Sequence, residues 1–394
     1  MREHNLAVVL GEVIRQQPVT RARLAEVTGF TKTTVSNLLA VLADAGLVRD
    51  GGLVHEGERG RPGVAVSIDG NGAAGLGLEI NVDYLAACIL DLGRQIRYRH
   101  VVAIDNRGRA PKAVIGALGR LAREAIASAE AQKLAVAGAV VALPGLVDRE
   151  RGFLRRAPNL GWTDVPTGDL LRAGLPALRL PIEHDNEANL AALGELWFGA
   201  GRTLGDFVHV SGEIGIGAGI VVDGRIFRGA HGFAGELGHV VVEPDGATCG
   251  CGGRGCLEQT AGQEAILRAA GLSQVTVTSA ASPDGSMSAL VARLEAGDAK
   301  ALAAVKRAGK ALGSTLTAVV NLLDPDTIVL GGIFSPLARW AQPAVEKALA
   351  KGGSGTLHGA VPRLVVSNLA GGAAVLGAAG LVIERVTADP SLML

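Results

Sequence analysis

Residues 235–259 read GELGHVVVEPDGATCGCGGRGCLEQ and carry the most specific chemical pattern in the chain. This stretch supplies one imidazole and three thiols, from His239, Cys249, Cys251 and Cys256. Such a donor set suits a tetrahedral zinc ion, and the glycines between the cysteines let a short loop fold around one ion. The alternative is three thiols without a metal beside a surface histidine.

The expected zinc ion is structural. Four protein ligands leave no open position for a metal-bound water, so we expect Zn²⁺ to cross-link this loop rather than to take part in chemistry. The C-x-C spacing is tighter than the C-x₂-C spacing of common zinc fingers, so a generic finger template fits poorly. The fourth cysteine of the chain, Cys88, stands alone in an apolar run and is expected to be a core residue.

The order G-E-x-G-H followed by C-x-C-G-x₂-G-C-L-E resembles the signature of the ROK family (repressor, open reading frame, kinase). The resemblance covers essentially the whole chain. It implies an α/β fold with a two-lobed, actin/hexokinase-like (ribonuclease H-like) body. One branch of the family consists of sugar kinases, and the other consists of sugar-responsive transcription factors with a winged helix in front.

The pattern on both sides of the zinc loop favours two related lobes. Three strand-like runs are followed by a helical stretch at about 110–132 and by a buried strand; the four strand-like runs are GAAGLGLEI, LAACILDL, YRHVVAI and AVAGAVVAL. A similar order returns with DFVHVSG, GAGIVVDG, HVVVEP, helices around 258–271 and 299–322, and TIVLGG. Two such units predict duplicated lobes with a ligand-binding cleft between them.

We expect three parts along the chain. Residues 1–70 form a winged helix-turn-helix DNA-binding domain with its wing and linker. Residues 71–185 form the first α/β lobe, which a C-terminal helix within 373–394 joins. Residues 186–372 form the second α/β lobe and carry the zinc loop.

The expected DNA-binding domain begins with an apolar helix over residues 5–17. Thr20 and Thr31 are typical N-cap residues for two further helices. The segment LVRDGGLVHE (47–56) reads as two short strands joined by a DGG turn. Helix, short helix, tight turn, helix and hairpin together predict a winged helix-turn-helix. The last of its three helices, which starts after Thr31, is the recognition helix that enters the major groove.

Polar residues near the start of the recognition helix can bind phosphates and base edges. RGRPG at 59–63 is extended by its proline and glycines and could reach a minor groove. The expected DNA-binding residues are Arg23, Thr31, Lys32, Thr33, Thr34, Ser36, Asn37, Arg59 and Arg61. The alternatives are a three-helix bundle with a solvated face and, for RGRPG, an inert linker.

The family resemblance also implies a sugar pocket, because the motifs P-N-L-x-W, N-D-A-N, G-E-x-G-H and C-L-E return here as APNLGW, DNEAN, GELGH and CLEQ. Carboxylates and amides bind adjacent sugar hydroxyls with paired hydrogen bonds. The implied sugar ligands are Asn159, Asn186, Glu187, Glu236, His239 and Glu258. His239 would hold zinc through one ring nitrogen and the sugar through the other. The alternative is a scatter of surface carboxylates.

The nucleotide side departs from the family pattern. The position of the kinases' catalytic aspartate in N-D-A-N is Glu187, whose carboxylate is one methylene further out. The first phosphate loop, D-x-G-x-T, aligns with EINVD (79–83), and the second, G-T-G-x-G-x-G, aligns with EIGIGAG (213–219). Glu213 and Ile214 replace a glycine and the phosphate-binding threonine, so we expect no functional ATP site and no catalytic residues.

These expectations favour a sugar-responsive transcriptional regulator, a repressor similar to the xylose-repressor branch of the family. Its partners would be double-stranded operator DNA and a small sugar, and it would act as a homodimer or homotetramer. The 38 basic and 38 acidic residues give no net charge, and no apolar run is long enough for a membrane span, so we expect a cytoplasmic protein without a membrane partner. The alternatives are a ROK sugar kinase with an appended DNA-binding domain and a zinc-stabilised DNA binder with an unused pocket.

Overall fold

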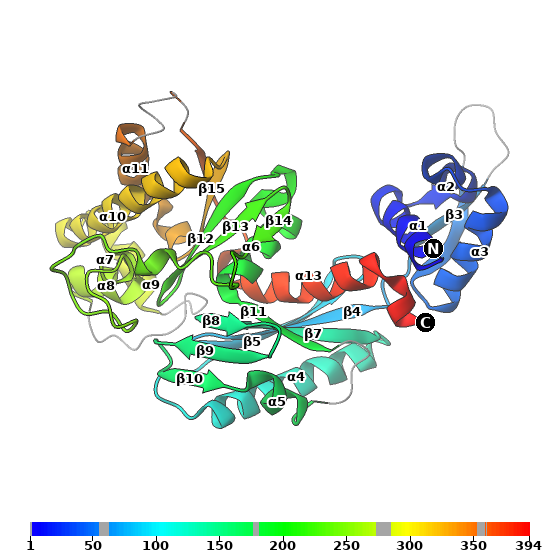
Figure 1. Ribbon diagram of the computed structural model, residues 1–394, viewed down its shortest axis with the longest axis horizontal. Coiled ribbons are helices and arrows are strands. Elements are labelled where there is room, and N and C mark those ends of the chain that lie inside the picture. Colours follow the sequence, from blue (N-terminus) through cyan, green and yellow to red (C-terminus); the bar gives the residue numbers. More distant parts are fainter. Residues whose placement is uncertain (1, 55–62, 176–180, 273–284, 353–358, 360) are drawn as a thin grey trace.

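The computed structural model places a small N-terminal head beside two α/β lobes (Figure 1). It describes residues 2–54, 63–175, 181–272, 285–352, 359 and 361–394. Two of the expected DNA-binding residues, Arg59 and Arg61, lie outside the described residues.

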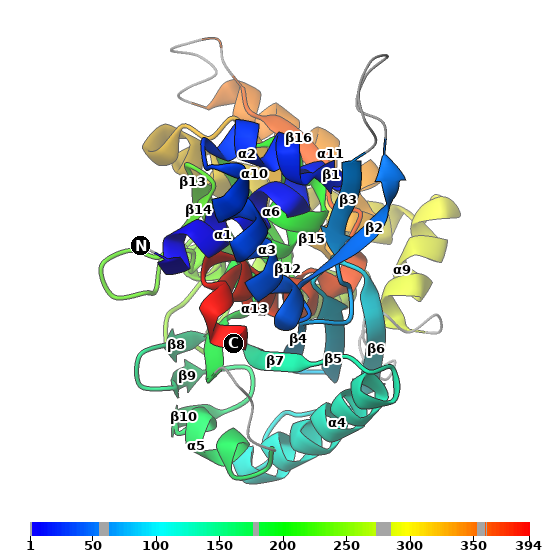
Figure 2. The ribbon, with the colours of Figure 1, turned by 90° about the vertical axis from the view of Figure 1, so that its right-hand side faces the viewer.

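The described part of the head consists of three helices and a small sheet (Figure 2). Its elements are α1 (Arg2–Gln16), β1 (Val19–Thr20), α2 (Arg21–Thr28), α3 (Lys32–Asp44), β2 (Val48–Val54) and β3 (Gly63–Ile68). Thr20 Oγ1 accepts a hydrogen bond from the backbone N–H of Arg23 at 3.2 Å, and Thr31 Oγ1 accepts one from Thr34 at 3.1 Å. Both predicted N-caps are therefore confirmed, and the head is a winged helix-turn-helix.

The wing differs from the predicted hairpin. The strands of the head sheet lie in the order β1-β3-β2, and β2 pairs antiparallel with β3, Val48 opposite Ile68. The prediction of a DGG turn at 50–52 is wrong, because β2 runs through these residues. A register shift between Asp50 and Leu53 accommodates the two glycines as a bulge, so the strand continues where a turn was expected.

The first lobe is built on a five-stranded sheet in the order β11-β7-β4-β5-β6. Strands β4, β5 and β6 are antiparallel neighbours, whereas β7 and β11 run parallel to β4. A smaller antiparallel sheet, β10-β9-β8, lies beside it. The elements are β4 (Ala74–Ile80), β5 (Tyr84–Asp91), β6 (Ile96–Ala103), α4 (Pro111–Ala131), β7 (Val136–Leu143), β8 (Leu146–Asp148), β9 (Phe153–Ala157), β10 (Trp162–Val165), α5 (Thr167–Arg172) and β11 (Ile182–Asn186).

The second lobe repeats this topology, with strands in the order β14-β13-β12-β15-β16. Its two antiparallel and two parallel strand pairings follow the same pattern as in the first lobe, which confirms the duplicated, two-lobed fold. The strands are β12 (Phe207–Gly212), β13 (Ile216–Val222), β14 (Arg225–Phe227), β15 (Thr327–Gly332) and β16 (Arg363–Val366).

Helices cover both faces of the second sheet. Apolar residues of α10 and α11 pack on one face, and α6 packs on the other face against β12 and β13. The helices of this half of the chain are α6 (Glu187–Phe198), η1 (Ala200–Thr203), η2 (Leu237–His239), α7 (Glu258–Ala261), α8 (Gln263–Ala269), α9 (Ser286–Glu295), α10 (Ala299–Leu323), α11 (Phe334–Lys351), η3 (Ala370–Gly372), α13 (Ala373–Ala388) and η4 (Pro390–Met393).

One predicted strand of the second lobe is absent from the sheet. The segment HVVVEP was expected as the third strand, but β14 takes that position. Residues 240–243 instead follow the short helix η2, and Val241 makes only an isolated bridge to Cys256. The apolar side chains of Val240 and Val241 are exposed, because this segment belongs to the loop that gathers the cysteines rather than to the sheet core.

The C-terminal helix α13 connects all three parts. It packs on the face of the first sheet opposite α4 and lies against α6 (Figure 1). Its far end and η4 contact α1 of the head, and one apolar cluster includes Leu6 and Leu10 of α1 together with Val386 and Met393. The boundaries 1–70, 71–185 with 373–394, and 186–372 remain predictions. Within the described ranges, none of the helices is both long and apolar enough to cross a bilayer.

The contact between α13 and α6 leads to a stability prediction. A Cβ atom on Gly377 of α13 would lie 1.9 Å from the carbonyl oxygen of Leu190 on α6, so Gly377→Ala should force the helices apart and lower the free energy of unfolding by roughly 1–3 kcal/mol. Gly11→Ala is the matched control, because Gly11 of α1 has open space around its Cβ position and alanine favours helix by about 0.5–1 kcal/mol. In urea unfolding, the free energy of unfolding should fall for Gly377→Ala and rise for Gly11→Ala. Equal changes in both variants would contradict the close contact between the helices.

Candidate metal centre and interlobe pockets

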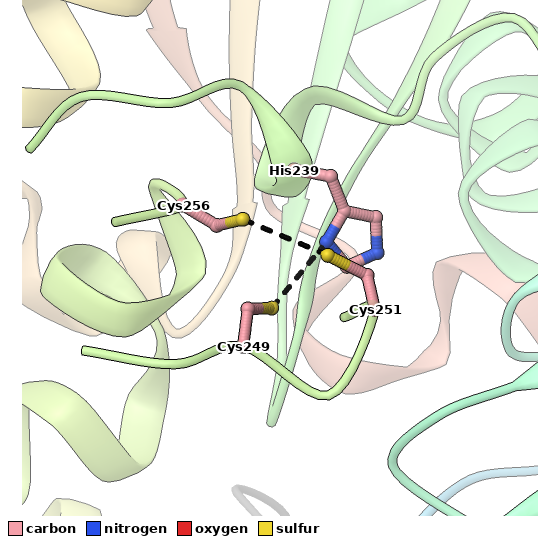
Figure 3. Close-up of side chains that lie close together, drawn as sticks. All are labelled: His239, Cys249, Cys251 and Cys256. Carbon is pink, nitrogen blue, oxygen red and sulfur yellow. Dashed lines mark hydrogen bonds between the residues drawn. The ribbon is translucent and has the colours of Figure 1, made fainter. Parts of the chain in front are cut away.

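The four predicted metal ligands converge on one point (Figure 3). The ligand atoms of His239, Cys249, Cys251 and Cys256 all lie within 4.8 Å of one another. Cys249 Sγ lies 3.7 Å from His239 Nδ1, and Cys251 Sγ lies 3.7 Å from Cys256 Sγ. No disulfide joins these cysteines. A tetrahedral zinc ion about 2.3 Å from two sulfurs separates them by about 3.8 Å, so the spacing and the donor set both fit zinc.

The loop around this cluster is folded by short backbone contacts. The bridges Val241 to Cys256 and Thr248 to Arg254 bring the two halves of the loop together. Gly255 has a φ of +65°, and a Cβ atom there would lie 1.5 Å from a backbone oxygen, so only glycine fits this turn. The loop is fixed to α10, since Arg307 donates two hydrogen bonds to the Glu243 carboxylate at 2.8 and 2.9 Å.

All six predicted sugar-binding residues line one pocket between the lobes, which we call the polar pocket. The space inside it, including solvent at its open side, is about 530 Å³. These residues come from the loop after β9, the start of α6, the loop before η2, η2 itself and the start of α7. They are Asn159, Asn186, Glu187, Glu236, His239 and Glu258.

The polar side chains of this pocket are engaged to different degrees. Asn186 accepts hydrogen bonds from the backbone N–H groups at the start of α6 and donates to the Gly145 carbonyl oxygen at 2.9 Å, so it caps the helix. Asn159 Nδ2 lies 3.5 Å from Glu258 Oε2. His239 turns Nδ1 to the cysteines and Nε2 toward Glu236 Oε2 at 3.7 Å, so one ring faces both the metal cluster and the pocket.

Burial shifts the carboxyl groups of the polar pocket toward their neutral forms. Burial, together with the nearby Glu79 and other carboxylates, raises the pKa of Glu187 from 4.5 to about 8. Burial also raises the pKa of Glu236 and Glu258, although hydrogen bonds from Asn159 and a backbone N–H lower that of Glu258. A neutral carboxyl group can donate as well as accept a hydrogen bond, which suits the paired hydroxyls of a sugar.

A second hollow lies next to the polar pocket. The space inside it, including solvent at its open side, is about 300 Å³. We call it the carboxyl pocket. Its polar lining comes from both lobes and includes Glu79, Tyr84, Glu187, His209, Ser211 and Glu213. Glu187 and Asn81 line both pockets. Tyr84 Oη donates to Glu79 Oε1 at 2.5 Å, and Asn81 Nδ2 donates to Tyr84 Oη at 3.2 Å.

Sequence reasoning missed several polar residues of this hollow. It treated EINVD only as a degenerate phosphate loop and assigned no role to Glu79 or Asn81. It also left out Tyr84 and His209, which stand in apolar strand runs and are buried. Polar residues inside otherwise apolar strands were the available signal, because a buried polar group needs a partner.

The recognition helix α3 presents its predicted DNA-binding residues to solvent. The five α3 residues are exposed except for half-buried Thr34, and Thr31 is also exposed. Arg23 on α2 is exposed too, but its guanidinium donates to Glu26 at 2.8 Å. The opposite face of α3 is buried through Val35, Leu38, Leu39 and Leu42.

Comparisons with known proteins agree with this arrangement. Residues 75–385 match the ROK family model, and residues 7–52 match a MarR family model. A putative xylose repressor of Caldicellulosiruptor sp. (strain Rt8B.4) is 30% identical over 99% of this chain and 98% of its own length. The crystal structure of a ROK family transcriptional regulator, described as a homologue of the E. coli MLC protein, superposes with a TM-score of 0.80. It is 25% identical and covers 99% of this chain and 98% of its own.

A ROK family glucokinase from Streptomyces griseus, solved with glucose and AMPPNP, is 27% identical with a TM-score of 0.62. It covers 78% of this chain and 98% of its own length. The family match spans residues 75–385, which include both lobes and the Cys/His cluster. The chain belongs to the ROK family.

Proposed function

We propose that this protein is a sugar-responsive transcriptional regulator, a repressor that binds operator DNA through α3. The observation that carries the proposal is the single apolar cluster that joins a winged helix-turn-helix to α13, whose other end lines the carboxyl pocket next to the polar pocket. The full-length similarity to a putative xylose repressor supports the same function. Such a regulator would act in the cytoplasm as a homodimer or homotetramer on a palindromic operator.

The proposed DNA contact uses the exposed polar start of α3. Lys32, Thr33, Ser36 and Asn37 are solvent-exposed and lie on the face opposite the buried core, where the helix can enter the major groove. Thr31 and Thr34 hydrogen-bond to each other at 2.9 Å, so the N-terminal turn is preorganised. Arg23 would reach a phosphate only by leaving Glu26.

The proposed effector is a small sugar in the polar pocket. Carboxyl and amide groups of Asn159, Glu236 and Glu258 face the same hollow and can pair with adjacent hydroxyls. Because the pocket is lined by both lobes, a sugar that contacts both would favour one lobe arrangement over another. It would thereby change DNA affinity through its different affinities for the two states.

The proposal includes the loss of the family's kinase activity. Glu187 replaces the catalytic aspartate by a longer side chain, and EINVD (79–83) lacks the glycine and threonine of the first phosphate loop. Glu213 gives a carboxyl group where the second phosphate loop has a glycine. Ile214 is buried in the apolar cluster of the first lobe and offers no hydroxyl. A sugar kinase with an appended DNA-binding domain is the competing function.

The Cys/His cluster would hold a structural Zn²⁺ ion through His239, Cys249, Cys251 and Cys256. When bound, zinc would supply a closed cross-link of the loop and no open coordination position. The ring of His239 would then be fixed with Nε2 toward the polar pocket, so the metal would orient one sugar ligand.

Removing a side chain of α3 should weaken DNA binding. We expect Asn37→Ala to reduce operator affinity about 5- to 150-fold, which corresponds to the roughly 1–3 kcal/mol of a base contact. Lys32→Ala should lose a phosphate contact. The slope of the logarithm of operator affinity against the logarithm of salt concentration should therefore become less steep by about one. Lys347→Ala on α11 removes the same charge far from the head. Fluorescence anisotropy with DNA from the chain's own promoter region measures the effect, and equal affinities for all three variants would contradict the α3 interface.

A sugar panel tests the effector and the nucleotide together. We expect at least one sugar among xylose, glucose and N-acetylglucosamine to raise the thermal midpoint, with a stabilisation of about 2.7 kcal/mol at a hundredfold excess over Kd, whereas Mg-ATP should not. Glu258→Gln should abolish the shift, and Glu295→Gln on the exposed side of α9 should keep it. No shift with any sugar would favour an unused pocket, and coupled-assay turnover near ~1 s⁻¹ or above would favour a kinase.

Metal analysis tests the cluster. We expect about one zinc ion per chain in the purified protein, because four ligands converge. Cys251→Ser should lose most of the metal and lower the thermal midpoint, since metal binding and folding of the loop are coupled. Cys88→Ser is the matched control, because Cys88 is buried in a strand away from the cluster and should leave the zinc content unchanged. Equal zinc contents in both variants would argue against the assigned ligands.

A further inference from the structure

The carboxyl pocket brings three glutamates together from both halves of the molecule. Glu79 lies on β4 of the first lobe, Glu187 begins α6, and Glu213 follows β12 of the second lobe. The start of α13 closes the hollow with Ala373 and Ala374. Three ionised carboxylates here would repel one another strongly, because charges interact far more in a buried site than in water.

Several enclosed atoms of this pocket lack a partner. Glu79 Oε2, Glu187 Oε2 and His209 Nδ1 are shielded from solvent and make no hydrogen bond. Glu79 is 2% exposed and His209 is 1% exposed, so solvent does not solvate them. Among the described residues, the lining of the pocket contains no lysine or arginine. The negative charge of three carboxylates would therefore have no compensating side chain in the lining.

The surroundings add further negative charge. The charge of Asp83, which follows β4, raises the pKa of Glu187 and Glu213, and the charges of Glu236 and Glu258 raise the pKa of Glu187. Arg99 on β6 is a cation that lowers the pKa of Glu79. Tyr84 Oη of β5 donates a hydrogen bond to the Glu79 carboxyl group, and this bond and the backbone of Val375 on α13 lower the pKa of Glu79. Burial keeps the His209 imidazole neutral by lowering its pKa to about 4.

The protonation preferences of the three groups agree with this geometry. Burial raises the pKa of Glu79 from 4.5 to about 7 and that of Glu187 to about 8. Burial, together with the carboxylates of Asp83, Glu79 and Glu187, raises the pKa of Glu213 well above its ordinary value. Near neutral pH the pocket therefore retains protons that ordinary glutamates release.

We propose that Glu79, Glu187 and Glu213 form a shared proton-binding site that holds the two lobes and the start of α13 together. With protons bound, the carboxyl groups can donate to the unpartnered oxygens and to His209 Nδ1. When the protons leave, two or three negative charges face each other across the lobes, and the closed arrangement loses stability.

This site has a direct route to the head. The start of α13 lines the carboxyl pocket, and its far end shares an apolar cluster with α1. A change in the charge of the pocket that shifts α13 would therefore also shift the DNA-binding head. This last link rests on the proposed function, whereas the proton-binding site does not.

The sign of the pH dependence follows from the raised pKa values. A carboxyl group whose pKa is higher in the folded state stabilises the fold fully below its unfolded pKa near 4.5. That contribution is lost as the pH rises through the folded values of about 7 for Glu79 and 8 for Glu187. The unfolding equilibrium constant of the full chain should therefore rise with pH between 6 and 9, by up to about tenfold per pH unit for each proton released.

Neutral variants test the assignment. Glu213→Gln and Glu187→Gln keep the size of the side chain and remove its charge, so each should raise the thermal midpoint at pH 9 relative to wild type. The slope of unfolding free energy against pH gives the number of protons released on unfolding. Between pH 6 and 9 this number should fall by about one in each variant. Glu295→Gln on the exposed face of α9 should behave as wild type. If both pocket variants keep the wild-type pH dependence, the proposal is overturned.

Two further measurements keep the test informative. Infrared spectroscopy of wild type at pH 7 should show protonated carboxyl groups that disappear by pH 10, and their absence at pH 7 would overturn the proposal without any variant. Operator affinity should also change with pH in wild type and less so in Glu213→Gln. If neither protein binds DNA, the proposed function fails, and the stability and infrared results still decide the proton-binding site.

Discussion

The backbone contact that α13 makes with both β4 and α6 is the constraint on which the rest of the arrangement depends. A Cβ atom on Gly77 of β4 would lie 2.0 Å from the Val375 carbonyl oxygen, and one on Gly377 would lie 1.9 Å from that of Leu190. Both positions need glycine, because backbone meets backbone there. Since α6 packs on the second sheet and α13 on the first, this pair of helices fixes how the two lobes face each other.

The same helix connects the carboxyl pocket to the head. The residues at the start of α13 line the carboxyl pocket, and the apolar residues near its end are buried against α1. Close-packed interiors shift between discrete arrangements rather than deforming continuously. A displacement of such a helix at one end can therefore move its other end as well. In this structure no separate linker is needed between the pocket and the winged helix-turn-helix.

The sequence predicted the site best where the ligands are close together in the chain and their residue types suit one metal. The Cys/His cluster was predictable because its ligands lie within 18 residues of one another and suit one metal. The duplicated sheet was predictable because strand patterns recur. The DGG turn failed because glycines serve a bulge as well as a turn, and HVVVEP failed because an apolar run can also lie in an exposed loop. The contact of Gly377 with Leu190 is set by packing between distant segments, which local patterns do not encode.

The loop EIGIGAG (213–219) has structural roles between the lobes that its sequence alone did not indicate. From sequence, Glu213 and Ile214 mark only the absence of phosphate-binding groups. In the structure Ile214 is buried in the apolar cluster of the first lobe, although it belongs to the second, and Glu213 joins Glu79 in the carboxyl pocket. Both side chains therefore connect the lobes, one by apolar burial and one through a polar pocket.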